Sequence, residues 1–130
     1  MMAAGQGNGS MRTTVLAAAI AVLMLTTRAE AACQVSPHRF VFGSDIELDV
    51  EITGGTRCPI TIRLGVKSTA QSNRISSPPA NGMARTSGAA GVLYQPKAGF
   101  TGKDVFAFTV CGGGGGRSGC STVRVRVTVQ

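Results

Sequence analysis

The sequence contains no tryptophan, one histidine and one tyrosine, and only 6 of its 130 residues are Asp or Glu. Nucleophilic catalysis needs a nucleophile, a base and a group that orients the base. His38 has no nucleophile motif around it, and most of the acids fall in one short segment rather than around a cleft. The four cysteines include no Cys-x-x-Cys motif, which argues against zinc. These absences predict a protein without catalytic activity, metal or cofactor.

The first 31 residues have the pattern of a cleavable signal peptide. Arg12 precedes eleven uncharged apolar residues at 15–25, and residues 29–31 fit the small-x-small rule at a cleavage site. We expect cleavage before Ala32 and no transmembrane segment after it. A membrane anchor is disfavoured, because an eleven-residue helix would span about 16 Å of a hydrocarbon core about 30 Å thick.

Two questions about this segment stay open. Either Met1 or Met11 can be the start, because residues 1–10 add nothing to the signal. Lipid attachment at Cys33 is an alternative that the sequence disfavours, because Glu30 stands three places before it. An even number of cysteines behind an export signal predicts two disulfides and a secreted or periplasmic location.

Alternation of apolar and polar residues dominates residues 32–130. The sequence predicts seven strands, at 39–42, 45–52, 59–66, 82–86, 91–95, 104–110 and 123–129. No stretch of residues 32–130 has helical periodicity, and the polar segment 67–80 is expected to be a long surface loop. The pattern predicts one all-β domain, an antiparallel β-sandwich of two sheets.

Part of this domain resembles a known family. Residues 79–82 read PANG, residues 93–96 read LYQP, and residues 99–110 read GFTGKDVFAFTV. With the valine-rich last strand, these motifs are similar to those of bacterial immunoglobulin-like, cadherin-like repeats. The resemblance covers residues 78–129 and implies an immunoglobulin-like sandwich of the kind that serves as a spacer or adhesive module of surface proteins. Here the repeat occurs once, and residues 111–120, CGGGGGRSGC, replace the family's acidic hairpin.

The implied fold places the four cysteines at one end of the sandwich. Among three possible pairings it favours Cys33–Cys58 with Cys111–Cys120. Asp104 is expected to accept backbone N–H groups of the turn at 99–102, with calcium binding as the alternative.

The glycine-rich segment is the first candidate for a binding site. Five consecutive glycines predict a flexible loop, which a disulfide at its base would restrict to the tip. The candidate contact residues are Arg57, Gly114, Arg117 and Ser118. The alternative is a plain hairpin loop without a ligand.

Charge offers a second candidate surface. Counted from Ala32, eleven Lys and Arg stand against five Asp and Glu, a net charge of +6. The candidate basic face consists of Arg63, Lys67, Arg124 and Arg126. The acids at positions 45, 47, 49 and 51 are expected on the opposite sheet, so that the two outer faces carry opposite charges. An ordinary solvated surface is the alternative.

We therefore expect a non-catalytic, exported binding or adhesion module of the bacterial cell envelope, whose partner is an envelope protein or a glycan. The alternatives are a structural accessory subunit of an envelope assembly, or a polyanion-binding domain that uses the basic face. Nucleic acid is not an expected partner, and the oligomeric state is left open.

Overall fold

The computed structural model describes residues 31–130, so the signal peptide predicted for residues 1–31 lies almost entirely outside the described residues. Eight strands, and no helix, occur in the described part of the chain. Their bounds are β1 Ala32–Val35, β2 Ile46–Thr53, β3 Cys58–Thr61, β4 Ser68–Ser77, β5 Gly82–Thr86, β6 Gly91–Pro96, β7 Gly102–Gly114 and β8 Arg117–Val129.

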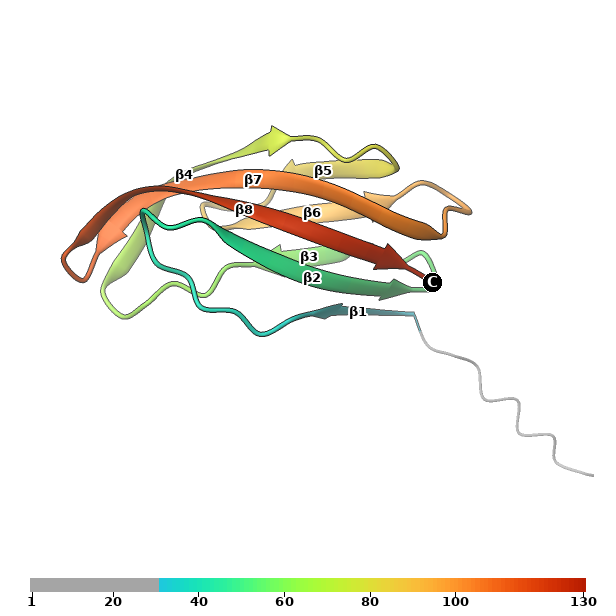
Figure 1. The fold of residues 1–130 in the computed structure, drawn as a ribbon, viewed down its shortest axis with the longest axis horizontal. Coiled ribbons are helices and arrows are strands. Elements are labelled where there is room, and N and C mark those ends of the chain that lie inside the picture. The colour runs from blue at the N-terminus through green and yellow to red at the C-terminus, as the bar shows by residue number, and fades with distance from the viewer. Residues whose placement is uncertain (1–30) are drawn as a thin grey trace, which may run out of the picture.

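The strands form two sheets that pack face to face (Figure 1). One sheet has five strands in the order β1-β2-β8-β7-β4, and the other has three in the order β3-β6-β5. Neighbouring strands run antiparallel except for β2 and β8, which are parallel. The predicted all-β sandwich is confirmed, with eight strands rather than seven.

The core lies between the sheets and consists of the inward residues that the alternation predicts. Along β8 the valines at 123, 125, 127 and 129 are buried, whereas Arg124 and Arg126 between them are exposed. The rings of Tyr94 and Phe106 stack at the centre, with their centroids 5.4 Å apart. Burial of such a side chain stabilises the fold by about 1.5–3 kcal/mol.

Three predictions about strands are wrong. The strand predicted at 59–66 ends at Thr61. Residues 39–42 form no strand, although Phe40 and Phe42 do enter the core. Residues 67–80 are not a loop, because most of them form β4, the edge strand beside β7. The pairing of β4 with β7 shifts register at two points, which breaks the strict alternation by which a strand is recognised.

A buried carboxylate joins the two sheets. Asp104, on β7, accepts hydrogen bonds from the backbone N–H groups of Ala80 (3.1 Å), Asn81 (3.0 Å) and Val105 (2.9 Å) and from the Tyr94 hydroxyl (2.8 Å). It therefore caps the turn before β5, and not the turn at 99–102 as predicted. Burial and the hydrogen bond to Asp104 raise the pKa of Tyr94 above its ordinary value. Four donors facing this carboxylate make it a structural anchor rather than a cation ligand.

Candidate functional site

The disulfides join Cys33 to Cys58 and Cys111 to Cys120, which is the predicted pairing. The first links β1 of the larger sheet to β3 of the smaller sheet. The second joins directly opposite residues of the β7–β8 ladder. One disulfide therefore ties the two sheets together, and the other ties two strands of a single hairpin.

The two disulfides lie at opposite ends of the sandwich, which overturns the prediction of a shared end. Cys33 is level with Ile52 on β2, and Ile52 is level with Val129 at the end of β8. Cys120 lies nine residues earlier on β8, a distance of about 30 Å along an extended strand. The reason is the parallel pairing of β2 and β8, which brings the end of β2 beside the end of the chain (Figure 1).

The glycine run is a strand and not a flexible loop. Strand β7 continues to Gly114, β8 begins at Arg117, and only Gly115 and Gly116 lie between them. Both have positive φ, 61° and 82°, as a tight two-residue turn of type I′ requires. The hairpin beyond Cys111–Cys120 is therefore an ordered continuation of the larger sheet.

Close backbone approach explains the glycines better than flexibility does. A Cβ atom at Gly112 would lie 2.7 Å from Cζ of Phe42 and 2.9 Å from Cα of Ala70, inside normal carbon contact distance. A Cβ atom at Gly114 would overlap the carbonyl oxygen of Lys67. The glycines let β4 and the Phe42 ring pack directly against the backbone of β7.

We call the end of the sandwich formed by residues 40–44, 65–69 and 111–120 the hairpin pole. Ser121 fastens the first of these segments to β8, because its Oγ accepts the N–H of Gly43 (2.9 Å) and donates to the carbonyl of Val41 (3.1 Å). The three segments contain two cations, Lys67 and Arg117, and no Asp or Glu. The hairpin pole is thus an ordered surface of positive charge.

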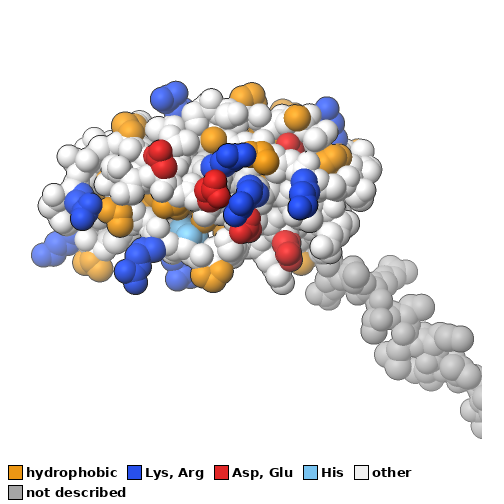
Figure 2. Space-filling view, in the orientation of Figure 1, with side chains coloured by type: hydrophobic (Ala, Val, Ile, Leu, Met, Phe, Trp, Pro, Cys, Tyr) orange, Lys and Arg blue, Asp and Glu red, His pale blue; other side chains and the backbone are white. Residues whose placement is uncertain are grey.

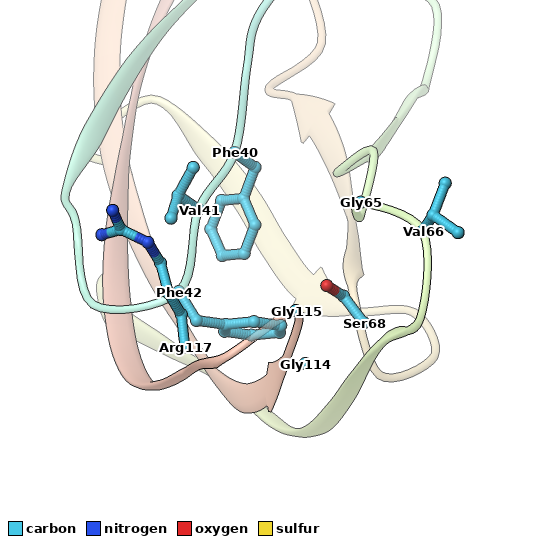
Figure 3. Close-up of a pocket in the computed structure, with 9 residues that line it drawn as sticks. All are labelled: Phe40, Val41, Phe42, Gly65, Val66, Ser68, Gly114, Gly115 and Arg117. Atoms are coloured by element: carbon cyan, nitrogen blue, oxygen red, sulfur yellow. The ribbon is translucent and has the colours of Figure 1, made fainter.

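A shallow hollow of about 240 Å³ opens on the hairpin pole (Figure 3). The rings of Phe40 and Phe42, 5.1 Å apart, form its floor. Arg117 rises along one wall beside Val41, and Ser68 stands on the other side. The hollow therefore combines a cation, a hydroxyl and bare glycine backbone.

A protruding turn stands next to this hollow. Val66 points away from it into solvent and is 88% exposed, the most exposed large apolar side chain in residues 31–130. Lys67 follows with a φ of 64°, rare for a residue other than glycine. The N–H of Ser68 closes the turn by donating to the carbonyl of Gly65 (3.1 Å). The sequence predicted Val66 as an inward strand residue, so this protrusion was missed.

The structure brings together three of the four predicted contact residues. Gly114 lies opposite Arg117 in the hairpin, and Ser118 lies opposite Gly113. Arg57 is at the other end, next to Cys58, on the outer side of the three-stranded sheet with Met83 and Arg85. Arg57 therefore does not belong to this site.

The predicted basic face does not exist as one surface. Arg124 and Arg126 lie on β8, beside the acidic residues of the parallel strand β2. Basic and acidic side chains are intermixed on this face of the molecule (Figure 2). Arg126 bonds to Glu47 (3.4 Å) and to Asp49 (2.9 Å). The predicted separation of charge between the sheets is wrong, because the acidic strand and the last strand are neighbours.

The remaining members of that predicted face lie elsewhere. Arg63 follows β3 of the smaller sheet, and its backbone N–H donates to Nε2 of His38 (3.4 Å). Lys67 belongs to the hairpin pole. A polyanion would therefore find no continuous row of these four cations.

The fold and the disulfides define an immunoglobulin-like β-sandwich domain. A family model described as Bacterial Ig domain matches residues 17–128, and the chain belongs to this family. Its members are generally non-catalytic modules of the surface or adhesion type. A search of the curated proteins finds no match. Within residues 31–130, no helix is long and apolar enough to cross a membrane.

Proposed function

We propose that this chain is an exported, non-catalytic binding module of the bacterial cell envelope and that the hairpin pole is its contact surface. The observation that carries the proposal is position. Ala32 and Val129 both lie at the opposite end, which we call the terminal pole, about 40 Å from Arg117 along β8. The hairpin pole therefore faces away from both Ala32 and Val129, where the chain enters β1 and leaves β8.

The chemistry of the hairpin pole supports a role in binding. An exposed apolar side chain, Val66, precedes the cation Lys67, and Arg117 lies across the hollow from it. Arginine is enriched at protein interfaces. The backbone beneath them is fixed by pairing on both sides of β7 and by the disulfide. A fixed surface loses little conformational entropy on binding, where each immobilised side chain costs about 0.5–1.5 kcal/mol.

Different observations support the two other parts of the proposal, export and the lack of catalytic activity. Two disulfides, together with the signal peptide predicted for residues 1–31, favour a secreted or periplasmic location. Both ring nitrogens of His38 make backbone contacts, to the carbonyl of Ser36 (3.2 Å) and the N–H of Arg63 (3.4 Å). The single imidazole is thereby used to hold two loops together, which supports a non-catalytic protein.

The proposal is tested by capture from envelope extract with the immobilised oxidised domain. The test variant is Arg117→Ala with Ser118→Ala, and the matched control at the terminal pole is Arg57→Ala with Thr56→Ala. We expect the control to capture the same partner as the unmodified domain and the test variant to lose it. Equal capture by both variants would remove the hairpin pole from the proposal.

Assembly through a sheet face is a second candidate function. Strands β3, β5 and β6 contain no Asp or Glu, and Met83 on β5 is 72% exposed. Arg57 and Arg85 flank Met83 in the same shallow depression. Sedimentation of the pure domain over a range of concentrations tests this role. A mass that stays monomeric throughout would exclude assembly with itself.

A further inference from the structure

We propose that the ligand of the hairpin pole is an acidic polysaccharide. This inference rests on the proposed function and names the chemistry of its partner. The evidence comes from the two cations of the hairpin pole, from the bare glycine backbone between them, and from the kinds of side chain that the surface does not offer.

The cations of the hairpin pole have no internal carboxylate to neutralise them. In the part of the chain that the structure describes, the ion pairs join Arg126 to Glu47 and Asp49, and neither Lys67 nor Arg117 takes part in one. The nearest acid in sequence to the hairpin pole, Asp45, accepts the N–H of Thr122 (2.8 Å). Lys67 and Arg117 are therefore available to an anionic ligand.

The segments that carry these cations lie close together at the hairpin pole. Ser68 on β4 is level with Gly114 on β7, which is level with Arg117 on β8, so the backbone next to Lys67 is about two strand spacings, or roughly 10 Å, from that of Arg117. An extended anionic chain that crosses the hairpin can therefore meet both residues.

The surface between the cations suits hydroxyl groups. The space where a side chain would begin at Gly115 and Gly116 is open, with no atom of a non-adjacent residue within 4 Å, so a sugar ring can approach their backbone closely. Their N–H and C=O groups can exchange hydrogen bonds with sugar hydroxyls. The glycine turn therefore offers a polar platform without side chains that would hold a ring away.

Other anionic partners fit this surface less well. Proteins that bind single-stranded nucleic acid stack bases on exposed aromatic rings, but Phe40 and Phe42 are 6% and 4% exposed. Val66 points away from the hollow, so an acidic protein seated there would not cover this exposed apolar side chain. Acidic polysaccharide is the class that uses charge and backbone polarity together.

Calorimetric titration of the oxidised domain with polygalacturonate and with dextran sulfate tests the inference. The test variant is Lys67→Ala with Arg117→Ala, and Arg57→Ala with Arg85→Ala removes the same charge elsewhere. At low ionic strength we expect affinity to fall about tenfold or more in the test variant and to stay nearly unchanged in the control. Thermal unfolding of each variant verifies that it is folded.

Four results would overturn the inference. They are no binding of either polysaccharide, equal weakening in both variants, equal binding of neutral dextran, and equal or tighter binding of polyglutamate, which would indicate an acidic protein partner. If any of them occurs while capture from envelope extract still depends on Arg117 and Ser118, the contact surface stands and only the ligand class is wrong.

Discussion

Each end of the sandwich has one disulfide, and the two disulfides have different structural roles. At the terminal pole, Cys33–Cys58 joins one sheet to the other, and Cys58 is fully buried. At the hairpin pole, Cys111–Cys120 joins neighbouring strands of one sheet, and Cys120 is exposed. The first disulfide holds the core together. The second stiffens a surface that has glycine backbone where a strand normally has side chains.

Removal of each disulfide is expected to give the largest effects and to separate the two poles. The bonded cysteines are 25 and 9 positions apart in sequence, for which chain entropy gives about 3.5 kcal/mol for Cys33–Cys58 and about 2.6 kcal/mol for Cys111–Cys120. Paired Cys→Ala variants in a denaturant titration measure both losses. We expect the variant without Cys33–Cys58 to unfold at a lower denaturant concentration than the variant without Cys111–Cys120.

Amide hydrogen exchange of the same variants shows whether each disulfide protects the whole domain or only the strands next to it. Loss of Cys111–Cys120 is expected to accelerate exchange at residues 112–114 while the amides of β2 stay protected. Uniform acceleration across the domain in that variant would contradict a local role for the second disulfide.

Substitution of a single glycine tests whether close packing or flexibility requires the glycine run. Gly112→Val forces a side chain against Phe42 and the backbone of β4, and we expect a loss of about 2–3 kcal/mol in the free energy of unfolding. Gly115→Asn is the control, because its site is open and asparagine tolerates positive φ. If both variants lose equally little stability, the glycines serve only as a linker.

The anchor at Asp104 belongs to the terminal half, and Tyr94→Phe tests it. The change removes one of four donors to a buried carboxylate, so we expect a loss of about 1–2 kcal/mol at neutral pH. Denaturant titration of both proteins checks this value. Retained stability would show that the other three donors suffice.

The same pair of proteins gives a pH dependence. The pKa of Tyr94 is raised in the folded state, so the unfolded chain releases the phenolic proton first. Its stabilising effect is complete below pH about 10 and is lost as the pH rises above that value. Tyr94 is the only tyrosine, so phenolate absorbance is expected to appear only with unfolding. Phenolate absorbance from the folded protein at pH near 10 would contradict the buried hydrogen bond.

The smallest expected changes in stability come from single arginines, and they distinguish an arginine in an ion pair from one without. Arg126→Ala breaks contacts with Glu47 and Asp49, both exposed, and is expected to cost no more than about 1 kcal/mol. Arg117→Ala breaks no ion pair within residues 31–130 and is expected to change stability by less than about 0.5 kcal/mol. Thermal unfolding of both variants checks the order, and a larger loss for Arg117→Ala would make it a structural residue.

Local alternation was enough to predict the best strands and their inward sides. Residues 45–52 and 123–129 have apolar residues at every second position, because one face of each strand lies in the core. The polar strand β4 could not be found in this way. It is an edge strand with two register shifts, so its side chains follow no simple period.

The arrangement of the strands was harder to predict than the strands themselves. Nothing in the alternation of β2 indicates that it pairs with β8, 77 residues away, or that the pairing is parallel. That one pairing decides which charges are neighbours and which cysteines share an end. The resemblance to a repeat family identified the fold, but it placed Arg57 at the wrong pole. The close approach of β4 that makes glycine necessary at Gly112 and Gly114 is also a tertiary contact.

Amide hydrogen exchange of the domain, alone and with the partner captured from the envelope, tests the role of the hairpin pole most directly. We expect exchange to slow on binding at residues 65–69 and 112–118, with residues 54–57 of the terminal pole unchanged. Slowing at residues 54–57 with no change at the hairpin pole would contradict the proposal and place the contact surface at the opposite end of the sandwich.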